Sequence, residues 1–265
     1  MTHGSQPRTA GPNDPSAGAP ERLETGDGVE LAYHHTPGRS PGVIFCGGFA
    51  SDMTGTKAIE LEAHVTGRGH QFTRFDYQGH GQSTGRFEDG TIGLWHRDAL
   101  AILDQVTKGP QILVGSSMGG WVMTLMALAR PERLAGLIGI AAAPDFTEDL
   151  IWAEFDEPAR RALQETGVHL EPSEYSDTPT PITLKLIEDG RRHLVLRGPL
   201  PIKVPVRLLH GMRDPDVPHR LAVTLAERID GDDVQILLIK DGDHRLSTDR
   251  DLAVLRRTVE DLLSG

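Results

Sequence analysis

Residues 111–120 read QILVGSSMGG, in which an apolar run ends in a turn of small residues. The run predicts a short buried strand, and the apolar residues that continue to position 129 predict a helix directly behind it. Within the turn, Gly115, Ser117 and Gly119 have the spacing of the motif G-x-S-x-G. The glycines let strand and helix approach each other, and the turn holds Ser117 in a strained conformation that points its hydroxyl away from the sheet. The register therefore selects Ser117, rather than Ser116, as the predicted nucleophile.

A glycine-rich turn before a helix is also typical of phosphate-binding loops. Those loops follow G-x-x-x-x-G-K-[ST] or G-x-G-x-x-G. Residues 115–120 match neither pattern. The N-terminus of the helix behind Ser117 instead offers positive potential at the place where an oxyanion would form.

Segments on both sides of this turn alternate between strand-like and helix-like patterns. Strands are expected at residues 29–35, 42–46, 71–77, 111–114, 134–142, 206–210 and 234–239, and helices at 56–66, 94–106, 117–129, from about 219 and at 252–263. Alternation over such distances implies right-handed crossovers between parallel strands. The predicted fold class is α/β, with a mostly parallel sheet covered by helices on both faces.

Residues 145–203 interrupt this alternation, because they are too long for a single crossover. Between Asp145 and Thr178 the charge balance is 2 Arg − 10 Asp and Glu = −8. Insertions of this kind leave the carboxyl ends of strands, which is also where α/β proteins bind ligands. We therefore expect a small, mostly helical lid over the site. The alternative is a solvent-exposed segment that lies far from the reacting residues.

Composition restricts the classes of partner. The 265 residues contain 27 Lys and Arg against 38 Asp and Glu, a net charge of −11, which argues against nucleic acid or an anionic membrane surface as the main partner. The longest largely apolar run, residues 134–144, is too short for stable insertion across a bilayer. One cysteine excludes an intrachain disulfide and a cysteine-based zinc site. Neither a metal ion nor an organic cofactor is expected.

The first 22 residues contain no Val, Ile, Leu, Phe, Tyr or Trp. Such a stretch cannot bury enough apolar area to offset the entropy lost on ordering, so residues 1–22 are predicted to be a disordered tail and residues 23–265 the folded domain. The tail has neither the apolar centre of a secretory signal nor the basic side chains of a transit peptide. A cytoplasmic location is the resulting expectation.

A serine hydroxyl needs a general base, and that base needs an orienting carboxylate. In a sheet with this elbow the expected chain order is serine, acid, histidine. Asp214 lies in a polar loop after the strand at 206–210 and is the expected acid, with Asp216 and Asp145 as rivals. His244 lies in the loop after the last strand and is the expected base.

Two backbone N–H groups are expected to form an oxyanion hole. One belongs to Met118, which follows the nucleophile, and the other to Phe49, in the loop after an early strand. Gly47 and Gly48 allow that loop to approach a substrate carbonyl. Cys46 is expected to be a small buried core residue rather than a second nucleophile, and His210 is expected to pack or to form local hydrogen bonds.

Five stretches of the sequence carry a resemblance to known proteins: GFASDMTGTKA (48–58), RFDY (74–77), QILVGSSMGGW (111–121), ARPE (129–132) and RLLHGM (207–212). They resemble the α/β-hydrolase superfamily and, within it, the mitochondrial palmitoyl-protein thioesterase family, also described as acyl-glucuronide esterases. The resemblance runs from about Leu23 to the end. It implies Ser117, Asp214 and His244 as the triad and Phe49 as part of the oxyanion loop. The tail does not resemble a transit peptide, and its absence of transit character is more natural in a bacterial relative. The lid is the part that differs most from the family.

These features predict a serine hydrolase that cleaves carboxylic esters or acyl thioesters through an acyl-enzyme. The substrate is expected to be a small acyl ester or thioester, or an acylated protein. Six apolar residues are candidates to line the acyl pocket, and the alternative for each is a place in the core: Phe49, Met53, Met118, Trp121, Trp152 and Phe155. The alternatives are a peptidase or a C–C bond hydrolase on the same triad, or a catalytically silent binding protein of this fold.

Overall fold

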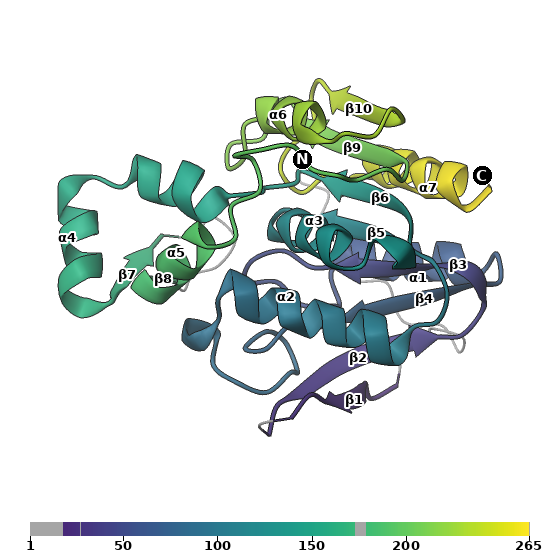
Figure 1. The fold of residues 1–265 in the computed structure, drawn as a ribbon, viewed down its shortest axis with the longest axis horizontal. Helices are drawn as coiled ribbons and strands as arrows, with labels where there is room; N and C mark the ends of the chain where they lie inside the picture. Colours follow the sequence, from purple (N-terminus) through teal and green to yellow (C-terminus); the bar gives the residue numbers. More distant parts are fainter. Residues whose placement is uncertain (1–17, 27, 173–178, 265) are drawn as a thin grey trace, which may run out of the picture.

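An eight-stranded sheet forms the centre of the fold (Figure 1), and the computed structural model describes residues 18–26, 28–172 and 179–264. In spatial order the strands are β1 (Glu21–Glu24), β2 (Glu30–Thr36), β4 (His70–Phe75), β3 (Arg39–Cys46), β5 (Gln111–Ser116), β6 (Leu134–Ile140), β9 (Val206–Gly211) and β10 (Val234–Ile239). β2 is antiparallel to β1 and to β4, and the other neighbours pair in parallel. The predicted α/β class with a mostly parallel sheet is confirmed.

Helices cover both faces of this sheet. One hydrophobic cluster includes residues of α1 (Thr56–Thr66) and α7 (Asp249–Ser264), and the other includes residues of α2 (Ile92–Ala101), α3 (Met118–Ala129) and α6 (Arg220–Arg228). The shorter helical turns η1 (Phe87–Asp89), η2 (Ile102–Val106) and η3 (Pro131–Arg133) flank α2 and α3.

The second half of strand β3 is apolar on both of its faces. Val43 and Phe45 pack in the cluster with α1 and α7, whereas Ile44 and Cys46 pack in the cluster with α2 and α3. Successive side chains of a strand point to opposite faces, so a strand covered on both sides buries an unbroken apolar run.

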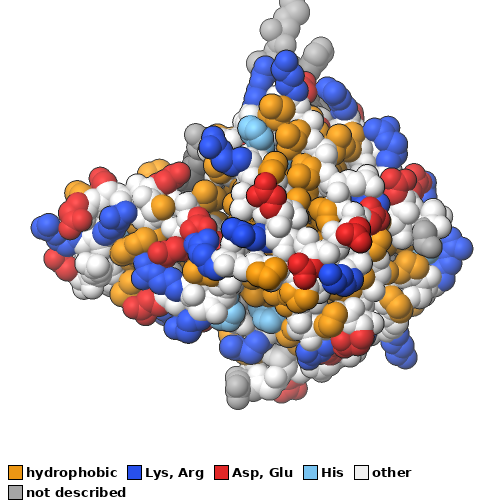
Figure 2. Space-filling model, turned by 45° about the horizontal axis from the view of Figure 1, so that its top comes forward, with side chains coloured by type: hydrophobic (Ala, Val, Ile, Leu, Met, Phe, Trp, Pro, Cys, Tyr) orange, Lys and Arg blue, Asp and Glu red, His pale blue; other side chains and the backbone are white. Residues whose placement is uncertain are grey.

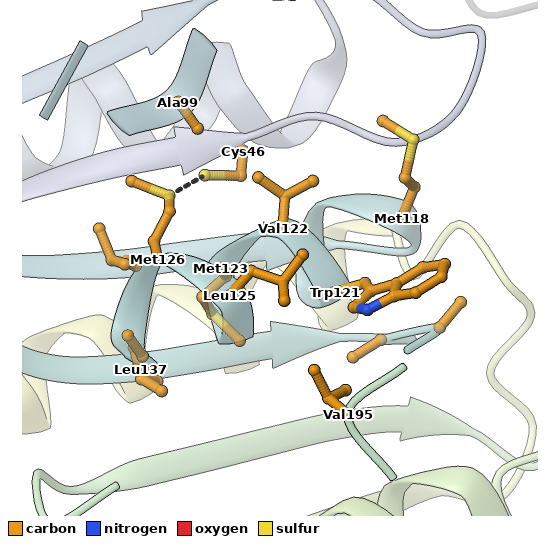
Figure 3. Packing of buried hydrophobic residues seen from close by; sticks show 14 of the residues in the cluster. Cys46, Ala99, Met118, Trp121, Val122, Met123, Leu125, Met126, Leu137 and Val195 are labelled. Atoms are coloured by element: carbon orange, nitrogen blue, oxygen red, sulfur yellow. Dashed lines mark hydrogen bonds between the residues drawn. The ribbon is translucent and has the colours of Figure 1, made fainter. Parts of the chain in front are cut away.

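Helix α3 packs deep in this core (Figure 3). Every residue from Met118 to Ala127 is buried, so the helix is apolar nearly all round. The Cys46 sulfur lies 3.9 Å from the Met126 sulfur, between β3 and α3. The start of α3, where Ser117 lies, is therefore held by dense packing on both the strand and the helix side.

Residues between β6 and β9 project beyond the end of the sheet (Figure 1). They form the π-helical turn η4 (Thr147–Trp152), α4 (Glu157–Thr166), the antiparallel hairpin of β7 (Val168–Glu171) with β8 (Thr180–Thr183), and α5 (Leu184–Arg191). The hairpin was not expected, because each of its strands is only four residues long. We call residues 145–203 the insertion. Figure 2 shows acidic, basic and apolar side chains mixed over its visible face.

Two other features differ from expectation. β1 begins at Glu21, within the stretch predicted to be a tail, and pairs with β2; residues 1–17 lie outside the described residues. An edge strand is held by backbone hydrogen bonds and does not need apolar side chains, so composition gave no signal for it. The helix expected at 94–106 is α2 followed by the π-helical turn η2. Among the described residues, no helix has the length and apolarity required to cross a membrane.

Candidate active site

Ser117 lies between β5 and α3 with φ 54° and ψ −119°, a strained conformation for a residue that has a Cβ. Hydrogen bonds hold the turn on both sides: the Ser117 N–H donates to the Ile140 carbonyl at 2.9 Å, and the Ser117 carbonyl accepts from the Ala143 N–H at 3.0 Å. Both partners come from β6 or the residues that follow it. The neighbouring strand therefore helps to stabilise the strained turn that presents the hydroxyl.

The two glycines of the motif are required by close backbone contacts. A Cβ on Gly119 would lie 2.6 Å from the Gly47 carbonyl oxygen and would overlap that of Cys46. A Cβ on Gly115 would lie 2.6 Å from the Gly119 carbonyl carbon. Strand, helix and the loop after β3 meet here at distances that only glycine permits.

The His244 side chain connects Ser117 to Asp214. Its Nε2 lies 3.1 Å from the Ser117 Oγ, and its Nδ1 lies 2.8 Å from the Asp214 Oδ2. Asp214 follows β9 and His244 follows β10, and the carboxyl ends of β5, β9 and β10 meet at one edge of the sheet. The three residues named from the sequence thus form one hydrogen-bonded chain.

The Asp214 carboxylate is completely buried and fully partnered. Its Oδ1 accepts the backbone N–H groups of Asp216 at 2.9 Å and Val217 at 2.8 Å. Burial by itself raises the pKa of this carboxyl, but hydrogen bonds from His210 and His244 outweigh burial and hold the pKa well below its usual value. The carboxylate consequently remains ionised and acts only as an acceptor toward His244.

The rival acids occupy other places. Asp216 is exposed, and its backbone N–H supports Asp214. Asp145 is buried at the start of the insertion, where its carboxylate accepts the N–H groups of Val195 and Leu196 at 2.8 and 2.9 Å. Asp214 is the carboxylate that contacts the His244 Nδ1 at 2.8 Å.

His210 lies behind Asp214 and is fully buried. Its Nε2 is 3.0 Å from the Val217 carbonyl oxygen and 3.3 Å from the Asp214 Oδ2. It therefore forms the local hydrogen bonds expected of it, and it also contacts the acid, which the sequence did not indicate.

Phe49 and Met118 line the same cavity as Ser117 and His244. Met118 is the first residue of α3, so its N–H has no acceptor within the helix. A Cβ on Gly48 would lie 3.5 Å from the Ser117 Cβ, which places the loop after β3 directly beside the nucleophile. The two residues whose backbone N–H groups were named from the sequence therefore border the same cavity as Ser117.

The cavity in front of Ser117 has a volume of about 620 Å³ and a mainly apolar wall. Much of that wall comes from the insertion. The apolar side chains that line it include Phe49, Phe87, Met118, Ala143, Phe146, Leu150, Ile151, Ile182 and Val217. A second, more polar cavity of about 450 Å³ shares Ser117 and His244 and extends toward Ser51, Lys57 and Arg245. Burial lowers the pKa of Lys57 to about 8.

Of the six pocket candidates, Phe49 and Met118 line the cavity, whereas Met53, Trp121, Trp152 and Phe155 are not among the described residues of its wall. Met53 and Trp121 are almost fully buried in the protein core, and the Trp121 Nε1–H donates to the His193 carbonyl at 3.0 Å. Trp152 and Phe155 pack against the small core inside the insertion. Their apolar character was recognised, but it serves packing rather than the cavity.

Within the described residues, one group of three possible metal ligands occurs: Asp214, Asp216 and His244. Two of these side chains belong to the hydrogen-bonded chain that ends at Ser117. A cation held there would occupy the His244 nitrogen or the Asp214 oxygen on which that chain depends, so the group is poorly suited to a resident metal.

Comparison with known proteins agrees with this geometry. Residues 40–184 match the family described as serine aminopeptidase, S33. The palmitoyl-protein thioesterase ABHD10 of Bos taurus mitochondria is 40% identical over 245 residues, covering 91% of this chain and 79% of that protein. The crystallised putative hydrolase from Agrobacterium vitis is 40% identical with a TM-score of 0.88, covering 92% of this chain and 97% of that one.

The solved structure of mouse α/β hydrolase domain-containing protein 10 superposes with a TM-score of 0.86 at 39% identity, covering 93% of this chain and 99% of that one. Similarity of this extent spans the sheet, the elbow and the insertion together. The chain belongs to the ABHD10 palmitoyl-protein thioesterase family of α/β-hydrolases.

Proposed function

We propose that this protein is a serine hydrolase that cleaves carboxylic esters or acyl thioesters through an acyl-enzyme on Ser117. The observation that carries the proposal is the continuous chain from the Ser117 Oγ through His244 to the buried Asp214, at the inner end of an apolar cavity. The names of the ABHD10 relatives support a thioester or ester as the scissile bond.

In the first step the Ser117 Oγ attacks the carbonyl carbon while the His244 Nε2 removes its proton. Asp214 accepts from the Nδ1–H, which fixes the tautomer in which Nε2 is the base, and it stabilises the imidazolium that forms. The imidazolium then protonates the leaving alcohol or thiol. Water, activated by His244, attacks the acyl-enzyme and releases the carboxylic acid and free Ser117.

The tetrahedral oxyanion would lie between the backbone N–H groups of Met118 and Phe49. Donors held by a helix N-terminus and a tight turn before the reaction would need little reorganisation as charge develops on the oxygen. The positive end of α3 adds to the same potential.

The acyl group would occupy the apolar cavity, since that cavity has few polar groups to hold a charged or hydroxylated chain. Small acyl esters, acyl thioesters and acylated proteins are the substrate classes proposed. The more polar cavity on the other side of Ser117 would receive the leaving group.

A fluorophosphonate probe tests the nucleophile directly. The wild type and Ser116→Ala should be labelled, whereas Ser117→Ala should not be labelled and should lose hydrolysis while keeping its unfolding transition. A series of p-nitrophenyl esters and acyl thioesters of increasing chain length then tests the substrate class. Turnover only of aminoacyl p-nitroanilides would favour the peptidase alternative, and a wild type that takes no label would favour a catalytically silent protein.

A further inference from the structure

The loop after β3 makes a tight turn at the proposed oxyanion site. The Ser51 N–H and the Ser51 Oγ both donate to the Gly48 carbonyl, at 3.3 and 2.8 Å, so Phe49 and Ala50 are the two central residues. Ala50 has φ 53°. A positive φ at the third position of a turn is normally supplied by glycine or asparagine, so the turn is strained at the residue after the proposed donor Phe49.

A buried histidine from a distant segment holds this strained residue. The Ala50 N–H donates to the His80 Nε2 at 3.2 Å, and the His80 Nδ1 lies 3.3 Å from the Gln78 carbonyl oxygen. A backbone N–H can only donate and a carbonyl can only accept, so these partners require a neutral ring with its proton on Nδ1. His80 is 4% exposed and follows β4 in the turn QGHGQS.

The same aromatic group holds both His80 and Phe49. The His80 ring packs edge-on against Trp95 and Phe87, each with ring centres 5.1 Å apart. The Phe49 ring lies 4.9 Å from Phe87 and 5.8 Å from Trp95. The side chain of Phe49 and the peptide after it are therefore fixed relative to one rigid cluster.

The far end of the loop has its own anchor. The Met53 N–H donates to the Asp76 Oδ1 at 2.7 Å, and the Met53 carbonyl accepts from the Arg74 Nη1 at 3.3 Å. These contacts fix where the loop ends. They do not determine the orientation of the Phe49–Ala50 peptide, because that peptide lies inside the turn closed by Gly48 and Ser51.

We propose that His80 is a positioning residue for the hydrolytic reaction: by accepting the Ala50 N–H it locks the turn in the conformation that directs the Phe49 N–H at the oxyanion. The inference rests on the proposed function for its catalytic consequence. His80 touches neither the nucleophile nor the proton relay in the contacts described, so its effect would be transmitted through the loop backbone.

Two variants separate the hydrogen bond from packing. His80→Phe keeps an aromatic ring but removes the acceptor. It should lower kcat about 10- to 100-fold while KM stays within about twofold. This loss of kcat is no larger than that typical of deleting one oxyanion donor. His80→Gln restores an acceptor of similar reach and should recover most of the activity. The Ki of an alkyl boronic acid, whose tetrahedral adduct uses the same donors, should rise as kcat/KM falls.

His70→Phe is the matched control, because His70 is also 4% exposed but is the first residue of β4, at the opposite end of that strand from His80. It should lose stability with kcat unchanged. If His80→Phe loses only stability and keeps kcat and the boronic acid Ki, or if His80→Gln is as impaired as His80→Phe, the positioning role is overturned.

A measurement without turnover distinguishes this inference from the proposed function. In NMR spectra of the wild type, the Ala50 amide should exchange slowly and the His80 Nε2 should have the ¹⁵N shift of an unprotonated nitrogen. In His80→Phe the Ala50 amide should exchange at least tenfold faster. If the Ala50 amide exchanged equally fast in both proteins, the role of His80 in holding the loop would be overturned, whether or not the protein hydrolyses esters. If instead the protein proved not to be a hydrolase, the expected difference in exchange would still hold.

Discussion

The carboxylate of Asp145 accepts a hydrogen bond of 2.8 Å from the backbone N–H of Val195, which lies 50 residues later in the chain. The neighbouring Leu196 N–H donates to the second carboxylate oxygen at 2.9 Å. One buried side chain thus joins the start of the insertion to its end, beside the wall of the apolar cavity.

Asp145→Ala should lower the free energy of unfolding by about 2–4 kcal/mol, because two buried backbone donors lose a charged acceptor. Asp145→Asn retains one acceptor oxygen and should lose less. Urea unfolding measures both changes. Limited proteolysis within the insertion should accelerate in the same order, and equal cleavage rates for the three proteins would contradict this role.

Asp98 provides a pH-dependent test of stability. Burial raises its pKa to about 6, although hydrogen bonds from the Gln78 backbone and side chain act in the opposite direction and lower the pKa. The folded state therefore binds this proton more tightly than the unfolded state. The stabilising contribution of protonated Asp98 to the free energy of unfolding is complete below about pH 4 and is lost as pH rises through 6. From pH 4 to 7, Asp98→Asn should gain up to about 3 kcal/mol of unfolding free energy relative to the wild type. If the free energy of unfolding of the two proteins changed with pH in the same way, this role of Asp98 would be contradicted.

Gly119→Ala should be strongly destabilising, by about 3 kcal/mol or more, since its Cβ would overlap the carbonyl oxygens of β3 and the loop after it. Gly198→Ala is the control, because a Cβ there would have no heavy atom within 4 Å. Thermal unfolding of both variants checks the difference. Equal melting temperatures would mean that strand and helix have room to separate at the elbow.

Cys46 should be inert in the folded protein. Its side chain is fully buried, and burial raises the pKa of the thiol to about 12, so almost no thiolate is present at pH 8. DTNB should react with one thiol only after urea is added, and Cys46→Ala should retain fluorophosphonate labelling. Rapid reaction of the native protein would show that β3 opens to solvent.

Asp214→Asn should lower kcat by about 10³- to 10⁴-fold with the fold retained, because the amide no longer fixes the reactive tautomer of His244. The kcat of Asp216→Asn should fall less than about tenfold, since the backbone N–H through which Asp216 donates to the Asp214 carboxylate is kept in this variant. Steady-state kinetics of the two variants decide between the acids. A larger loss in Asp216→Asn would exchange their roles.

Local sequence was enough to predict the elbow, because Gly115, Ser117 and Gly119 have a fixed spacing between a strand-like and a helix-like run. It did not show which backbone requires Gly119 to be glycine, because Cys46 and Gly47 lie about 70 residues earlier in the chain. It was also enough to name His244, since strand order brings its loop to the same edge. The choice between Asp214 and Asp216 needed coordinates, because both lie in one polar loop and differ only in which carboxylate is buried.

The cavity wall could not be predicted in the same way. Trp121 follows Ser117 by one helical turn, but that turn faces the core, so its indole donates to His193 rather than facing a ligand. Many of the residues that line the cavity come from the insertion, which is anchored by contacts such as that of Asp145 with Val195. The contact between His80 and Ala50 likewise joins segments 30 residues apart, and the turn QGHGQS gave no sign of its partner.

The reacting side chains follow β5, β9 and β10, whereas much of the apolar wall lies between β6 and β9. The wall that we propose to hold the acyl group is thus largely separate in sequence from the segments that carry the reacting side chains. Substitutions in residues 145–203 are therefore expected to alter the choice of acyl group more than the chemical step. Such substitutions would have to keep Asp145 and its hydrogen bonds to the Val195 and Leu196 N–H groups, because these join the start of the segment to its later part.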